Sequence, residues 1–272
     1  MPYRYDENDY SAGLGNRLLI LANYILNHSK VSASQSGRIL KLLGYSETKK
    51  TSHAELPIYP SSNLHDKLVG SLLPLLELEQ TGIANKWLPV VRNAVTGLSH
   101  VVIHVRGTDI VSADGEYGIE ISDMSYYGPV IDQIVETEKN PVFTVVSDDK
   151  DFSLVHQINE YLTKRKARQS FQLRTKRWLL SALHGKMYAD WISLLSADII
   201  VMNTSTFPLS TLLFHQKRLR RVFISLDQLN RFEKRINKME SQQKRSQEEI
   251  FLQFWKELPH KTNKEEIRIL LF

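Results

Sequence analysis

Polar residues that can hold phosphates and move protons follow three short apolar runs of this chain. The run at 101–105 contains His104 and is followed by Arg106 and Asp109. A guanidinium at the end of a buried strand keeps its charge and needs an anion. That anion is either a neighbouring carboxylate such as Asp109 or a phosphate of a ligand. The residues alone leave both alternatives open.

Two further polar clusters follow the runs at 142–146 and 199–202. The first consists of Ser147, Asp148 and Asp149, and the second contains Asn203, Ser205 and Thr206 ahead of Pro208. Hydroxyl groups and free backbone N–H groups at a helix N-terminus can form a binding site for phosphate. Taken alone, either cluster is explained at least as well by helix capping. Because the carboxyl ends of parallel strands meet at one edge of a sheet, we expect all three clusters to converge on a ligand site there.

The elements that position these clusters are strands that alternate with helices. Short β-rich runs lie at 101–105, 142–146, 199–202 and 222–224, separated by helix-length segments at 126–138, 151–162, 186–195 and 209–214. This alternation predicts a parallel, doubly wound sheet with helices on both faces, so the fold class is α/β.

The segments before and after this α/β part lack its alternation of strands and helices. A Gly-rich turn opens into an apolar helical segment near residue 13, and residues 33–79 favour two or three helices and no strand. Residues 3–9 are too polar for a buried parallel strand. We therefore expect a small, abbreviated, mostly helical N-terminal domain at 1–97, followed by a Rossmann-like domain at 98–226.

The C-terminal part, 227–272, begins with a long amphipathic segment. Leu229, Phe232, Ile236 and Met239 recur at helical spacing, and basic and acidic residues are nearly balanced. This pattern predicts a helix that packs across the domains rather than a nucleic-acid-binding arm.

Composition excludes several function classes. The 272 residues contain no cysteine, which excludes disulfides, thiolate metal sites and a cysteine nucleophile. A net charge of +5 is too small for a polycationic tail and favours an anionic partner without specifying which. We expect no nucleic-acid partner. No apolar run reaches the roughly 18 residues of a membrane span, and no signal peptide is visible, so we expect a cytoplasmic protein. Neither metal-ligand spacing nor a Walker-type motif is present, so we expect no metal and no ATP chemistry.

In order and spacing, these motifs resemble the α-1,2/α-1,6/protein O-fucosyltransferase superfamily. The likeness is carried by Gly13-Leu-Gly-Asn-Arg17, His104-x-Arg106-x-x-Asp109, Ser147-Asp-Asp149 and Ser205-Thr206-Phe207. The His-x-Arg signature is its most specific part, and the likeness spans residues 13–214. It implies a two-domain GT-B fold and an inverting transfer of fucose from GDP-fucose to a glycan hydroxyl, without a metal or other cofactor.

The resemblance also implies roles for individual residues. Arg106 holds the diphosphate and neutralises it as it leaves, and His104 braces the loop or touches the donor. Asp148 or Asp149 binds guanine or ribose, and Ser205 and Thr206 bind the β-phosphate. The remaining donor-binding positions implied are Gly13, Gly15, Asn16, Arg17 and Asn203.

An inverting displacement needs a carboxylate that takes the proton of the acceptor hydroxyl. The resemblance favours Asp114 as this base, with Asp109 and Glu116 as alternatives. An exposed turn residue is an equally good explanation of Asp114, because Gly115 follows it. Gly107 stands where many relatives carry a second Arg, so donor affinity or sugar choice differs from theirs. An alternative function is a non-catalytic protein that binds nucleotide sugars or anionic glycans and has kept the donor pocket after losing part of the acceptor domain.

The segment 162–189 contains eight Lys or Arg and no acidic residue, with Phe171 and Trp178 interleaved. Such a stretch could contact RNA, an anionic lipid surface or a phosphorylated acceptor, and a solvated helix face with its loop is the commoner explanation.

Overall fold

The fold was analysed in a computed structural model. The structure describes residues 3–4, 55–56, 82–106, 123–148, 151–167, 170–203, 205, 207–208, 211, 218–237, 252, 256 and 268–271. The prediction for 209–214 and most of the predictions for 1–81 and 238–272 fall outside these residues.

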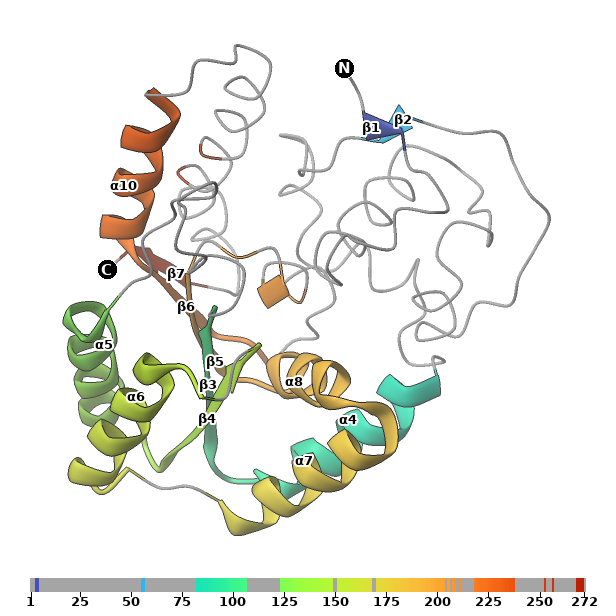
Figure 1. The fold of residues 1–272 in the computed structure, drawn as a ribbon. Coiled ribbons are helices and arrows are strands. Elements are labelled where there is room, and N and C mark those ends of the chain that lie inside the picture. Colours follow the sequence, from blue (N-terminus) through green and yellow to red (C-terminus); the bar gives the residue numbers. More distant parts are fainter. Residues whose placement is uncertain are drawn as a thin grey trace.

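A five-stranded parallel sheet lies at the centre of the described part (Figure 1). Its strands are β3 (Ser99–Val105), β4 (Pro141–Ser147), β5 (Ile199–Met202), β6 (Arg221–Ile224) and β7 (Arg268–Leu271). They are ordered β4-β3-β5-β6-β7, and every neighbouring pair is parallel. The strand order therefore reverses between β3 and β5. The four strands expected from the sequence are confirmed, and β7 is an additional strand.

Helices cover both faces of this sheet, as the alternating pattern predicts. On one side lie α5 (Met124–Thr137) and α6 (Ser153–Lys164), and on the other α4 (Gly82–Ala94), α7 (Phe171–His184) and α8 (Lys186–Leu195) (Figure 1). The amphipathic segment after residue 227 forms α10 (Leu226–Asn237), which buries Leu229 and Ile236 as expected. The α/β class with a parallel sheet is thus confirmed.

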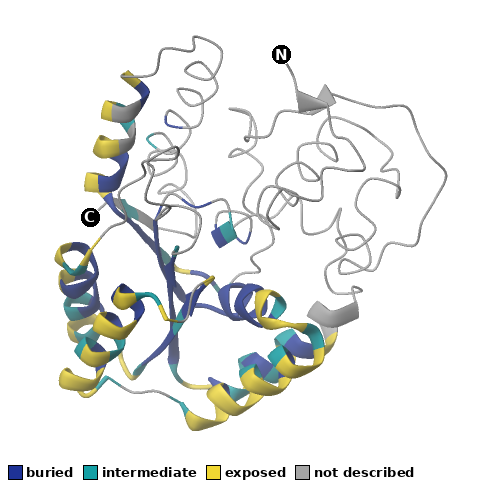
Figure 2. Ribbon diagram, in the orientation of Figure 1, coloured by how far each residue is buried: buried dark blue, intermediate teal, exposed yellow. Residues whose placement is uncertain are grey.

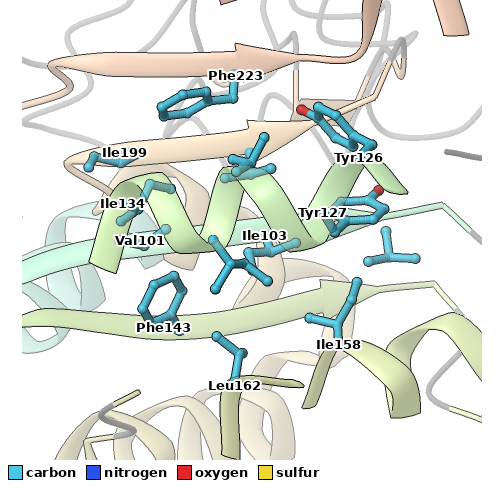
Figure 3. Close-up of a cluster of buried hydrophobic side chains, with 14 of the residues drawn as sticks. Val101, Ile103, Tyr126, Tyr127, Ile134, Phe143, Ile158, Leu162, Ile199 and Phe223 are labelled. Carbon is cyan, nitrogen blue, oxygen red and sulfur yellow. The ribbon is translucent and has the colours of Figure 1, made fainter. Parts of the chain in front are cut away.

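A cluster of buried apolar side chains lies between the strands of the sheet and the helices α5 and α6 (Figure 3). All seven residues of β3 are buried, which is why the strand appears in the sequence as a nearly continuous apolar run. Tyr127 and Phe223 are fully buried in the same layer, and Figure 2 shows the strands as the most buried part of the described chain.

The amino-terminal part shows one departure from expectation. Two-residue strands, β1 (Tyr3–Arg4) and β2 (Glu55–Leu56), pair in antiparallel fashion, so the prediction of no strand within 33–79 is wrong. A pair this short leaves no period-two pattern in the sequence. Helix α4, inside the first predicted domain, packs against α7 and α8. The division of the chain into 1–97, 98–226 and 227–272 stays a prediction.

The amino-terminal edge of the sheet contains a buried polar network in which each group has a partner. His100 contacts Thr144 Oγ1 through Nε2 at 3.1 Å and Ser196 Oγ through Nδ1 at 3.2 Å. Asp198 accepts the backbone N–H of His100 at 2.7 Å and is held by two nitrogens of Arg218 at 2.8 and 3.0 Å. Buried polar groups that are satisfied in this way stabilise a unique arrangement of the core.

None of the helices that the structure describes combines the length and the apolar character that a membrane crossing requires.

We predict that the free energy of unfolding falls as the pH drops from about 6.5 towards 5. Burial lowers the pKa of His100 to about 4, although the Ser196 carbonyl and the Asp198 carboxylate raise it, and burial lowers the pKa of His104 similarly. An unfolded histidine takes up its proton near pH 6.5, so in this window the unfolded chain binds more protons than the folded one. Each histidine contributes a slope of about 1.4 kcal/mol per pH unit.

Urea unfolding measured across this window tests the slope. His100→Gln should remove about half of it, and Gln157→Ala, which replaces an exposed residue of α6 without a titratable group, should leave it unchanged. An unaltered slope in His100→Gln would contradict the assignment.

Candidate functional site

The candidate site lies at the carboxyl ends of β3, β4 and β5. Val105 and Ser147 are paired in register at the ends of β3 and β4, so Arg106 and Asp148 leave the sheet side by side. Asn203 follows β5, the other neighbour of β3. The strand order reverses between β3 and β5, and in open parallel sheets ligands bind at this point because the connections diverge there.

His104 is the buried centre of this edge. Its side chain is almost inaccessible, and burial lowers its pKa to about 4, while the Asp148 carboxylate raises it and the Arg106 guanidinium lowers it further. The charge of Lys186 also acts on the ring. At neutral pH the imidazole is therefore uncharged. Charged groups from β3, β4 and α8 surround a neutral ring that can donate or accept hydrogen bonds.

Two side chains at this edge have buried polar atoms that remain unsatisfied. Within the described part of the chain, Nδ1 of His104 and both polar atoms of the Asn203 amide find no hydrogen-bond partner. The amide lies near enough to raise the pKa of His104, but the two groups form no hydrogen bond of good geometry. Each unsatisfied buried group costs about 1–3 kcal/mol. Unsatisfied buried groups call for an explanation, and completion of the site by a ligand is one.

Helix α5 contributes two hydrogen bonds to the backbone of the same edge. The Tyr126 hydroxyl donates to the Met202 carbonyl at 3.1 Å, and the Tyr127 hydroxyl donates to the His104 carbonyl at 3.3 Å. Burial raises the pKa of both tyrosines, so both hydroxyls keep their protons and remain donors. These bonds fix the backbone from which His104 and Asn203 project.

Lys186, at the start of α8, is a site residue that the sequence did not indicate. Its ammonium donates to the Ser147 carbonyl at the end of β4 and pairs with Asp190 at 3.2 Å. Gly185 precedes it with φ +93°, a conformation that favours glycine, and so allows α8 to begin directly after α7. In the sequence, a glycine between two helical segments, followed directly by a lysine, could have indicated this position.

Ser205 lies close by but has an ordinary local contact. It is buried, and its hydroxyl accepts the backbone N–H of Phe207 at 3.4 Å, as a capping residue would. The Phe207 ring lies 5.9 Å from the His104 ring, centroid to centroid. Phe207 therefore lies beside His104 of β3.

The described residues thus bring together five of the predicted positions: His104, Arg106, Asp148, Asn203 and Ser205. Arg106 is partly exposed. The other predicted positions lie outside the described residues: Asp109, Asp114, Glu116, Asp149, Thr206, Gly13, Gly15, Asn16 and Arg17. Among the side chains that the structure describes, no group of three or more His, Cys, Asp or Glu could hold a metal ion.

Comparison with protein-family models, with curated proteins and with solved structures finds no match for this chain.

We predict that Asn203→Leu leaves the free energy of unfolding of the ligand-free protein unchanged or raises it by about 1 kcal/mol. The leucine has nearly the same shape and removes two unsatisfied buried polar atoms. Thr144→Val is the matched control, because it deletes the buried partner of His100 and should lower stability by about 1–3 kcal/mol. Chemical denaturation of both variants decides the matter, and equal destabilisation would mean that Asn203 has a structural role.

Proposed function

We propose that this protein is an inverting glycosyltransferase that moves fucose, or a related sugar, from a GDP-sugar to a glycan hydroxyl, without a metal. The observation that carries the proposal is the gathering of Arg106 with the unsatisfied polar atoms of His104 and Asn203 at the strand-order reversal. A diphosphate would pair with the guanidinium, and its nucleoside or sugar would supply hydrogen-bond partners to the ring and the amide.

Arg106 is suited to stabilising the leaving group. It follows a strand that is paired on both sides, so its backbone is held before the ligand arrives. As the bond between the sugar carbon and the diphosphate oxygen breaks, its electron pair moves onto that oxygen. A guanidinium placed in advance stabilises the developing charge without reorganisation. Lys186 adds a second positive charge nearby.

Asp148 and the neutral His104 are suited to the nucleoside rather than to the phosphates. An ionised carboxylate accepts hydrogen bonds from ribose hydroxyls or from guanine nitrogens and repels phosphate. The imidazole stays uncharged at neutral pH because it is buried, so it contributes directional hydrogen bonding without further positive charge.

The acceptor hydroxyl forms its new bond to the sugar carbon on the face opposite the diphosphate and gives its proton to a carboxylate. Asp114 is our first choice for that base, and Asp109 and Glu116 are the alternatives. The sequence motif alone supports this part of the proposal.

We predict that GDP and GDP-fucose raise the melting temperature by about 5–10 °C at a hundredfold excess over Kd, whereas UDP-, ADP- and CMP-sugars do not. Arg106→Ala should bind GDP about ten- to a hundredfold more weakly, since it loses charge-assisted hydrogen bonds worth about 1.5–3 kcal/mol. Thermal shift and calorimetric titration measure both effects.

The matched control is Arg165→Ala, because Arg165 pairs with Asp132 at 2.5 Å beside the end of α6, away from the strand ends. It should bind GDP as the wild type does. If Arg106→Ala loses thermal stability but retains its affinity for GDP, the guanidinium serves an internal ion pair and the proposal fails.

We predict that Asp114→Asn slows release of GDP from GDP-fucose, with water as the acceptor, by about a hundredfold or more while GDP affinity stays unchanged. The same assay on Asp109→Asn and Glu116→Gln identifies the base if Asp114 is not it. Wild-type protein that binds GDP-fucose and releases no GDP, with or without glycan acceptors, would instead be the non-catalytic binding protein.

A further inference from the structure

Helix α7 exposes large apolar side chains on its outer side. Phe171 is 78% exposed, Trp178 70% and Leu183 59%. Met187 at the start of α8 and Leu179 are also exposed. In Figure 2 the outer side of α7 is coloured mostly as exposed, and the helix lies at the periphery of the described fold.

Two of the exposed apolar residues, Phe171 and Trp178, form a stripe opposite the face that α7 buries. Leu173 and Leu180 face the interior, Phe171 and Trp178 lie two turns apart on the other side, and Leu183 lies on the flank nearer to Leu180. A surface helix of a globular protein normally has one apolar face. A second one, with two exposed aromatic rings, is typical of a contact surface.

The charge around this stripe is of one sign. Residues 162–189 contain eight Lys or Arg and no acidic residue. Among α4, α7 and α8 the sole acidic residue is Asp190, which is buried and pairs with Arg177 and Lys186. The helices on the opposite face of the sheet differ, because α5 and α6 contain Asp132, Glu136 and Glu160. The layer of α4, α7 and α8 therefore has exposed apolar residues among basic ones, whereas the layer of α5 and α6 also contains acidic residues.

We propose that the outer face of α7, defined here as Phe171, Arg174, Lys176, Trp178 and Leu183, binds an anionic lipid surface with the helix lying parallel to it. Aromatic and aliphatic side chains on one side of a helix enter the boundary between headgroups and acyl chains, while flanking Lys and Arg contact anionic headgroups. α7 lies at the periphery of the described fold, where a planar partner can reach it (Figure 2). The proposal is independent of the proposed glycosyl transfer.

Flotation of the full chain with vesicles tests the proposal. The protein should float with vesicles of equimolar phosphatidylcholine and phosphatidylglycerol, and much less with phosphatidylcholine alone. Added salt should weaken binding because it screens the headgroup charge. Binding should also shift the emission of Trp178 to shorter wavelength, measured as the difference between wild type and Trp178→Phe.

Variants divide the binding into its apolar and charged parts. Trp178→Ser with Leu183→Ser should weaken partitioning at least about tenfold, since two exposed apolar side chains no longer enter the interface. Arg174→Gln with Lys176→Gln should weaken it about 25-fold, at about fivefold for each charge. The matched controls on α10, Leu226→Ser and Lys234→Gln, replace exposed residues and should bind as the wild type does.

Three results would overturn the proposal. The wild type fails to float with either kind of vesicle, it binds both kinds equally, or the α7 variants bind as the wild type does. If instead Trp178→Ser abolishes a concentration-dependent dimer in ultracentrifugation while the wild type ignores vesicles, the face is a contact between two copies of the chain. Thermal unfolding of each variant verifies that these exposed positions leave the fold intact.

Discussion

The parallel pairing of β3 with strands on both its sides is the constraint on which the candidate site depends. β3 is buried along its whole length and pairs with β4 over seven residues, so it cannot shift in register without breaking both ladders. Parallel neighbours end at the same edge. Arg106, Asp148 and Asn203 are therefore brought together by backbone hydrogen bonds, although nearly a hundred residues separate the first from the last along the chain.

The two ends of β3 differ in how well their buried polar groups are satisfied. At the amino end, His100 is buried, and its ring contacts Thr144 and Ser196. At the carboxyl end, His104 is equally buried, and its Nδ1 and the neighbouring Asn203 amide remain unsatisfied within the described residues. The two histidines have the same burial and similarly lowered pKa values. Local polar geometry therefore distinguishes a stabilising network from a candidate binding site.

Much of this arrangement could be predicted from the sequence, because strands buried on both faces leave continuous apolar runs. The runs at β3, β4 and β5 have such signatures, and the polar residues after them therefore lie at the edge where we expected them. β7 was missed because two of its three apolar residues are leucines, which favour helices, whereas the equally short β5 and β6 are rich in β-branched and aromatic residues. Lys186 was missed because its place in the site depends on its contact with the Ser147 carbonyl at the end of β4, a tertiary feature that the local Gly185 signal does not reveal.

Asp190 also determines how the outer face of α7 relates to the candidate site. This buried carboxylate pairs with Arg177 in the middle of α7 and with Lys186 at the start of α8, and Lys186 reaches the end of β4. Because the Asp190 carboxylate is buried and needs its cationic partners, the three side chains link α7 to the strand ends. A protein resting on lipid through α7 would therefore present the carboxyl edge of its sheet in a fixed orientation to that surface. Movement of the site relative to the membrane would then require the whole domain to move, rather than a hinge between α7 and α8.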